Sequence, residues 1–267
     1  MMTRYVAVLR SIVLVILFFN AAWVQAAQGP HVRQSPVDTP NRILFVGNSF
    51  MYYNDSLHNH VRRIVVAADP SIDNLLQYKS ATIGGSPLAH HNIQHLLGPG
   101  HLGIKQPFDI VILQEDSAAA LYDARRASFR ETVAAFNAEI VKHGAKTVLY
   151  MPHANVKPNK FASPDMIRKI EDMYVSVGNE MGLLVIPVGL AFEEAYRQRP
   201  DIKLHKDYDG LHPDLLGTYL AACVVYASLY GKSPVGNSYD YYGKVDKETA
   251  AFLQKTAEET VRKFFGR

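Results

Sequence analysis

Apolar residues follow two patterns that alternate along the chain. Short unbroken apolar runs are typical of strands buried on both faces of a parallel sheet, and apolar residues at a 3.6-residue period are typical of amphipathic helices. The runs predict strands at 43–46, 109–113, 147–150 and 183–186, and the more mixed segment 74–80 is expected to form a further strand. The periodic segments predict helices from about residue 55 and at 88–97, 122–143, 164–181, 190–197, 213–230 and 247–265.

Strands that alternate with helices predict a parallel sheet whose right-handed crossovers place helices on both faces. The predicted fold class is therefore α/β, a three-layer α/β/α sandwich around a sheet of about five strands. The carboxyl ends of parallel strands meet at one edge of such a sheet, and ligands bind there. Functional side chains are expected just after the strands.

The start of the chain has the pattern of a secretory signal peptide. Two arginines precede the apolar stretch 12–23, and small residues follow it up to Ala27. The stretch is short for a membrane span, and an uncleaved anchor is the alternative. We expect residues 1–27 to be removed after Ala26 or Ala27, which predicts a periplasmic or secreted protein without stable membrane association.

Residues 28–40 are polar and contain three prolines, which predicts an extended linker. The remaining residues, 41–267, are enough for one large domain with a buried core. The formal net charge of +3 gives no electrostatic reason to expect a nucleic-acid partner. Cys223 is the single cysteine and lies in an apolar helix, so it is expected to pack in the core rather than to react.

The first strand leads directly into a candidate nucleophile. Gly47 ends the apolar run, Ser49 follows it, and a helix begins shortly afterwards. A serine in such a turn lies at the ligand-binding edge of the sheet, and unpaired N–H groups at a helix N-terminus can receive an oxyanion. An ordinary serine in a connecting loop is the alternative.

A nucleophilic serine needs a histidine held by a carboxylate. Asp209 and His212 are three residues apart in a turn marked by Gly210 and Pro213, a spacing that can aim both side chains in the same direction. His212 would take the proton of Ser49, and Asp209 would hold the imidazole tautomer.

Gly47-Asn48-Ser49 and Asp209-Gly210-Leu211-His212-Pro213 resemble the first and last motif blocks of the SGNH/GDSL hydrolase superfamily, and the resemblance spans the expected mature chain. The first block of that family is usually Gly-Asp-Ser, so Asn48 is a departure. The resemblance implies a Ser49–His212–Asp209 triad, a five-stranded sandwich related to flavodoxin, and catalysis without a metal or an organic cofactor.

The resemblance also implies an oxyanion hole made by the Ser49 N–H and by residues of two further blocks. The second block supplies a glycine, for which Gly85 is preferred and Gly84 is the alternative. The third block is usually Gly-x-Asn-Asp, but 114–117 contains no asparagine. Gln114 carries the same amide on a side chain one methylene longer, so it is the expected substitute donor.

Histidines offer a competing chemistry. His91 and His95 are four residues apart and could share a helical face, a spacing that can hold zinc. The glutamate of a His-Glu-x-x-His pattern is absent, and solvated surface histidines are the preferred interpretation, so no metal is expected. His153 follows the fourth strand and could contact substrate, although an ordinary loop role is favoured.

The sequence thus predicts an exported serine esterase. By resemblance, the preferred substrate is an acetylated carbohydrate. A lipase, lysophospholipase or thioesterase with the same triad is the first alternative. From another class, a non-catalytic carbohydrate-binding or assembly protein, or an acetyl transferase, also fits a chain whose third block departs from the family pattern.

Overall fold

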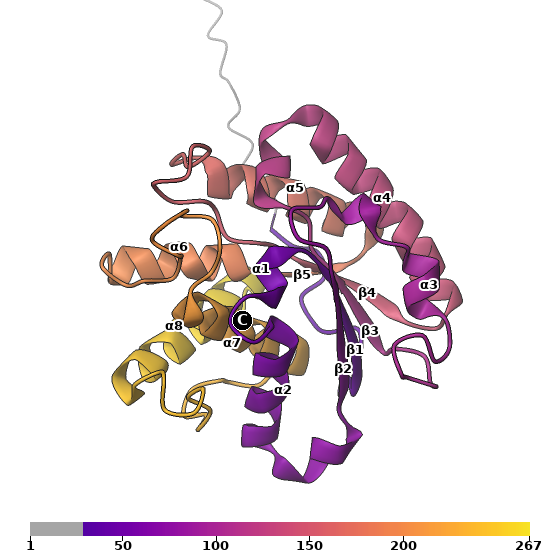
Figure 1. Cartoon of the computed structure of the whole chain (residues 1–267), viewed down its shortest axis with the longest axis horizontal. Coiled ribbons are helices and arrows are strands. Elements are labelled where there is room, and N and C mark those ends of the chain that lie inside the picture. Colours follow the sequence, from indigo (N-terminus) through magenta and orange to yellow (C-terminus); the bar gives the residue numbers. More distant parts are fainter. Residues whose placement is uncertain (1–28) are drawn as a thin grey trace, which may run out of the picture.

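The computed structural model describes residues 29–267, and the predicted signal peptide lies outside them. Within these residues the strands form one parallel sheet in the order β2-β1-β3-β4-β5 (Figure 1). The strands are β1 (Arg42–Gly47), β2 (Gln77–Thr82), β3 (Ile110–Leu113), β4 (Lys146–Tyr150) and β5 (Leu184–Ile186). The predicted five-stranded α/β/α sandwich is confirmed.

The α-helices cover both faces of this sheet (Figure 1), and short 3₁₀ turns (η1 to η3) join several elements. The α-helices are α1 (Ser49–Tyr52), α2 (Leu57–Ala68), α3 (Ile93–Leu97), α4 (Asp123–Lys142), α5 (Met166–Met181), α6 (Val188–Gln198), α7 (Leu215–Tyr230) and α8 (Lys247–Phe265). The 3₁₀ turns are η1 (Pro70–Leu75), η2 (Leu88–His90) and η3 (Ser117–Leu121).

The second strand was placed too early by the sequence pattern. Residues 70–75 form η1, because Pro70 fixes the first position of the turn and the Asp69 carboxylate accepts a hydrogen bond from the Ser71 N–H. The strand therefore begins at Gln77 and continues to Thr82, two residues beyond the predicted end. This shift brings the end of β2 level with Gly47 at the end of β1.

Unbroken apolar strands are explained by the two hydrophobic cores, one on each face of the sheet. Ile43 and Phe45 of β1 pack into the core formed with α2, α6, α7 and α8, whereas Leu44 and Val46 pack into the core formed with α3, α4 and α5. All four side chains are fully buried. Each such side chain contributes roughly 1.5–3 kcal/mol by leaving water, so β1 is a firm anchor for a residue at its end.

Helix α7 is apolar on every side because α2, α6 and α8 surround it. Cys223 lies in this helix, and burial raises the pKa of its thiol, which makes it a packing residue. Within residues 29–267, none of the helices combines the length and the apolar character needed to cross a membrane.

Residues 29–40 have no helix or strand, but they contact the domain. The Asn179 side chain on α5 accepts from the His31 N–H and donates to the Gly29 carbonyl. The Tyr230 hydroxyl donates to the Pro40 carbonyl. The segment predicted as a linker is thus held along the surface of the sandwich.

Candidate active site

Ser49 lies just after the end of β1, at the carboxyl edge of the sheet. Gly47 is required there, because any side chain at that position would collide with the Gln114 amide. Asn48 then caps α1, and its Oδ1 accepts a hydrogen bond from the Phe50 N–H at 3.2 Å. Ser49 is the first residue of α1, and its N–H has no hydrogen-bond partner in the part of the chain that the structure describes.

The structure brings the three predicted triad residues together. The Ser49 hydroxyl lies 3.0 Å from His212 Nε2, and His212 Nδ1 lies 2.6 Å from Asp209 Oδ2. Both distances are those of hydrogen bonds between a nucleophile, its base and the group that orients the base. Ser49 and His212 are 163 residues apart in sequence, so the fold is what brings them into contact.

Asp209 is held in place by the turn in which it lies. Its Oδ1 accepts hydrogen bonds from the backbone N–H groups of Leu211 at 2.8 Å and His212 at 3.1 Å, which leaves Oδ2 for the imidazole. Partial burial by itself would raise the pKa of Asp209, but these hydrogen bonds and the one from the His212 ring outweigh it and lower the pKa. The carboxylate stays ionised, as an orienting group for an imidazole must.

Gly210 fixes the position of the Asp209–His212 turn. Its φ of +59° is unfavourable for other residues, and a side chain there would collide with the Val156 carbonyl. The Val156 N–H donates to the Gly210 carbonyl at 2.8 Å, so the loop after β4 supports the turn that carries His212.

Aromatic rings enclose the imidazole of His212. Tyr53 stacks on it with 4.3 Å between ring centroids, and Phe50 meets it edge to face at 6.3 Å. Both rings follow Ser49 closely, so α1 and the residue after it provide the nucleophile together with the packing that restricts its base.

His153 does not reach the substrate side of the site. It is buried, and its Nε2 donates to the Leu211 carbonyl at 2.8 Å while its ring packs on Phe50. Burial holds the pKa of His153 well below its ordinary value, so the ring is neutral. His153 does not line the pocket, and it instead supports the residue before His212.

A second buried histidine predicts a loss of stability in acid. Burial lowers the pKa of His205 to about 4, with its ring between the Tyr196 hydroxyl and the Ala154 carbonyl. In the unfolded chain the imidazole of His205 takes up a proton near pH 6.5, whereas in the folded chain it resists protonation. The contribution of His205 to the free energy of unfolding is therefore complete above about pH 6.5. It falls by roughly 3 kcal/mol as the pH drops towards 4.

Urea unfolding between pH 7.5 and 4.5 measures this effect. A His205→Asn variant is expected to lose stability less steeply with falling pH than the parent. The exposed His31→Gln substitution is the control and should leave the slope unchanged. Parallel slopes for the parent and His205→Asn would contradict the prediction.

Gly85 contributes a free backbone donor to the site. It has φ of +68° in the loop after β2, and within residues 29–267 its N–H has no hydrogen-bond partner. Gly84 and Gly85 both line the pocket beside Ser49, so the loop after β2 lies where the sequence placed it.

Gln114, in contrast, is not placed to donate to an oxyanion. Its side chain is fully buried, its Oε1 accepts from the Asn48 N–H at 2.9 Å, and its Nε2 donates to the Glu115 carbonyl at 2.7 Å. The Gln114 N–H donates to the Val46 carbonyl and so continues the pairing of β3 with β1 by one residue. The Gln114 side chain therefore fills the space left open by Gly47. The prediction that Gln114 replaces the family's asparagine is wrong for this reason.

Asp116 is the residue after β3 that faces the pocket, and the sequence pattern did not single it out. Its Oδ1 accepts from the Ala118 N–H at 2.9 Å as the cap of η3, and its Oδ2 lies 3.1 Å from an Arg125 nitrogen. An aspartate directly before a helical turn was the available signal, since capping places such a side chain at the loop surface.

The pocket at Ser49 has a volume of about 310 Å³. Its walls are the end of β1 with α1, the loop after β2, Asp116 and the His212 turn, and its lining residues are Asn48, Ser49, Phe50, Tyr52, Tyr53, Gly84, Gly85, Asp116, Leu211 and His212. The nucleophile, its base and both free backbone donors therefore share one small space.

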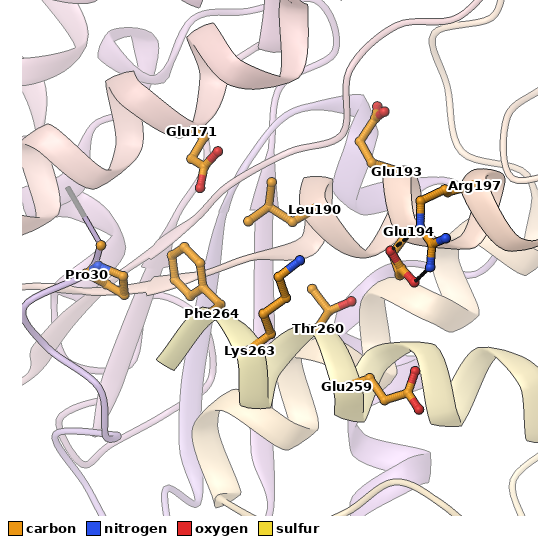
Figure 2. Close-up of a pocket in the computed structure, with 11 residues that line it drawn as sticks. Pro30, Glu171, Leu190, Glu193, Glu194, Arg197, Glu259, Thr260, Lys263 and Phe264 are labelled. Atoms are coloured by element: carbon orange, nitrogen blue, oxygen red, sulfur yellow. Dashed lines mark hydrogen bonds and ion pairs between the residues drawn. The ribbon is translucent and has the colours of Figure 1, made fainter. Parts of the chain in front are cut away.

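A larger cavity of about 780 Å³ lies elsewhere, between α5, α6 and α8 (Figure 2). Figure 2 shows that charged side chains surround it, including Glu171, Lys263 and the ion pair of Glu194 with Arg197. None of the described residues that line it is a serine, cysteine or histidine. The smaller pocket, which contains a nucleophile with its base, is the better candidate for an active site.

The histidines considered for metal binding do not converge. His91 is buried and its Nε2 donates to the Gly47 carbonyl at 2.8 Å, whereas His95 stacks on His101. Among residues 29–267, no group of three or more histidine, cysteine, aspartate or glutamate side chains is arranged to hold a metal ion.

Known structures share this architecture. A DUF4886 family protein from Bacteroides uniformis matches with a TM-score of 0.61 and 19% identity, over 81% of this chain and 93% of that one. A protein from Slackia heliotrinireducens, assigned as an SGNH hydrolase, matches with a TM-score of 0.58 and 21% identity, over 72% and 100%. The acetyl xylan esterase AlAXEase matches with a TM-score of 0.52 and 16% identity, over 70% and 98%.

The chain therefore has the fold of the SGNH hydrolases, as its motifs predicted. No family model matches the sequence, and no curated protein matches it.

Proposed function

We propose that this protein is a serine ester hydrolase. The observation that carries the proposal is the hydrogen-bonded series Ser49–His212–Asp209 at the edge of the sheet, with the unpaired Ser49 and Gly85 N–H groups beside the hydroxyl. A serine with a base, an orienting carboxylate and free donors is the set of groups that acyl transfer needs. The fold shared with SGNH hydrolases supports the same reaction class.

In the proposed reaction, Ser49 Oγ attacks the ester carbonyl while its proton passes to His212 Nε2. The carbonyl oxygen becomes an oxyanion and accepts hydrogen bonds from the Ser49 and Gly85 N–H groups. His212 then gives its proton to the leaving alcohol, and the C–O bond to the alcohol breaks. A water molecule then loses a proton to His212 Nε2 and attacks the acyl carbonyl. The bond from the acyl carbon to Ser49 Oγ breaks, the acyl group leaves as a carboxylic acid, and His212 returns the proton to Ser49 Oγ.

For the substrate we propose an acetyl ester of a carbohydrate. The pocket is small, at about 310 Å³, which suits a short acyl group better than a long chain. Two exposed tyrosines lie beside the partly buried Tyr53: Tyr52 stacks on Tyr53, and the Tyr208 hydroxyl lies 3.5 Å from that of Tyr53. Such rings offer flat apolar faces with polar ends, which suit sugar rings. The acetyl xylan esterase of similar fold is consistent with this choice.

We further propose that the protein is exported, since the signal-peptide pattern of residues 1–27 precedes the described domain. Mass spectrometry of the protein recovered from the periplasm or the medium would give its first residue. A chain that begins after Ala26 or Ala27 is the expected result, and a full-length chain retained in the membrane fraction would contradict the proposal.

Acyl-chain preference tests the substrate proposal. With p-nitrophenyl esters, kcat/KM is expected to be highest for acetate and to fall at least tenfold by octanoate, because the small pocket leaves much of a long chain in water. Acetate release from acetylated xylo-oligosaccharides should exceed release of fatty acid from lysophospholipid. A preference for octanoate would favour a lipase or thioesterase, and acetate release that requires an added acceptor alcohol would favour a transferase.

The tyrosines provide a finer test of the carbohydrate. Tyr208→Ala is expected to raise KM for the acetylated oligosaccharide about fivefold, since a lost stacking contact is worth roughly 1 kcal/mol. The effect on p-nitrophenyl acetate should be smaller, because that substrate has no sugar ring. Tyr122→Ala, which removes another exposed tyrosine outside the pocket, is the matched control. Equal effects of Tyr208→Ala on both substrates would contradict a sugar contact.

A further inference from the structure

The candidate oxyanion hole has two backbone donors but no donor where the sequence expected a side-chain amide. Both ends of the Gln114 amide are hydrogen-bonded to backbone groups, and Gln114 does not line the pocket. Asp116 takes the wall after β3 instead, and a carboxylate paired with Arg125 repels an oxyanion rather than donating to it. Among the described residues that line the pocket, Asn48 alone carries a side-chain amide.

The orientation of the Asn48 amide is fixed by the helix that it caps. Its Oδ1 accepts from the Phe50 N–H at 3.2 Å, so the oxygen faces α1. The Nδ2 end is consequently turned towards the loop after β2, where its hydrogen-bond partner is the Ser86 carbonyl at 3.4 Å. That distance is long for an N–H to O bond, so the amide keeps donor capacity for a better acceptor.

This arrangement places three donors around one space. Asn48 directly precedes Ser49, whose N–H is free, and Ser86 directly follows Gly85, whose N–H is also free. Asn48 is buried, so its amide is shielded from water and restricted by its cap, which are the conditions under which a donor stabilises developing charge.

We propose that Asn48 Nδ2 is the side-chain donor of the oxyanion hole. When Ser49 attacks, the oxyanion accepts from the Ser49 N–H, the Gly85 N–H and Asn48 Nδ2, and the long contact to Ser86 gives way to a stronger one. The residue before the nucleophile thus supplies the amide that the segment after β3 lacks. This inference rests on the proposed ester hydrolysis.

The test removes the amide and keeps the cap. Asn48→Ser retains a side-chain oxygen that can accept from the Phe50 N–H, and Asn48→Asp retains nearly the same shape. Both are expected to lower kcat on p-nitrophenyl acetate about 10²- to 10³-fold, with a much smaller change in KM, because the lost contact forms mainly in the transition state. Asn48→Asp should be the slower of the two, since it adds a negative charge beside the oxyanion.

Asn92→Ser is the matched control, since Asn92 caps α3 through the same kind of side-chain contact and does not line the pocket. It should keep the parental kcat. The Tyr52 hydroxyl, which lies next to Gly84, is the alternative side-chain donor in the pocket, and Tyr52→Phe removes it. Its loss in kcat should be at least tenfold smaller than that of Asn48→Ser.

The outcomes separate this inference from the proposed function. Parental kcat in Asn48→Ser, or a greater loss in Tyr52→Phe, would overturn the role of Asn48 while leaving ester hydrolysis by Ser49 intact. A parent that neither hydrolyses any ester nor reacts with a fluorescent phosphonate would overturn both. Circular dichroism and the melting temperature show whether a variant with lowered kcat is still folded, and so distinguish a lost donor from a lost fold. A folded Asn48→Ser variant with parental kcat decides against the inference.

Discussion

Replacing Ser49 with alanine is expected to reduce kcat/KM for p-nitrophenyl acetate by about 10⁴- to 10⁶-fold. The hydroxyl that lies 3.0 Å from His212 Nε2 is the atom that would form the acyl bond, and alanine leaves no other nucleophile at that place. The residual rate would come from the backbone donors acting on bound water. Stability should change little, because the lost group is one small hydroxyl at a pocket surface.

A fluorescent alkyl phosphonate gives an independent measurement, because it forms a stable bond with an activated serine and does not depend on turnover. Mass spectrometry of the labelled peptide should place the adduct on Ser49 in the parent and find none in Ser49→Ala. Ser71→Ala, an exposed serine in η1, is the control and should label as the parent does. Labelling that persists in Ser49→Ala would place the nucleophile elsewhere and remove the basis of the proposed function.

The sequence predicted the parts of the site that local chemistry determines. Gly47 ends an apolar run, so the position of Ser49 at the strand end followed from the pattern alone. Asp209 and His212 lie in a single turn, which makes their contact a local property of four residues. Their approach to Ser49 could be expected because a parallel sheet collects its strand ends at one edge.

The third block could not be assigned in this way, because it depends on where a ladder ends. The Gln114 N–H still pairs with Val46, and the side chain therefore continues the alternation of β3 into the space above Gly47. Asp116 is the first side chain free to face the pocket. A one-residue change in the end of a strand reverses the direction of its side chains, and the sequence pattern does not resolve that difference.

Buried histidines were also beyond the sequence pattern. His91, His153 and His205 are polar residues near loops, for which exposure was the reasonable expectation. Each instead donates a ring N–H to a backbone carbonyl of the site or its supporting loops, namely those of Gly47, Leu211 and Ala154. These contacts join segments far apart in sequence, so only the folded structure reveals them.

Asp209→Asn is expected to reduce kcat by about 10³- to 10⁴-fold while the protein remains folded. An asparagine can keep its Oδ1 as the acceptor for the Leu211 and His212 N–H groups, but its amide would then present a donor to His212 Nδ1. The ring would respond by carrying its proton on Nε2, so the nitrogen that faces Ser49 could no longer accept one.

Comparison with Asp209→Glu separates orientation from charge. Asp209→Asn keeps the shape of the side chain and removes its charge, whereas Asp209→Glu keeps the carboxylate and displaces it by one methylene. If Asp209 acts by holding the tautomer, raising the pH should partly restore the activity of Asp209→Asn, because hydroxide can take the place of the lost base. The pH profile of kcat from pH 6 to 10 measures this, with Asp207→Asn as the control, because Asp207 pairs with Lys203 outside the pocket. If Asp209→Asn retained parental kcat at pH 7, Asp209 would be a structural residue of the turn, and the hydrogen bond at 2.6 Å would serve only to position the loop.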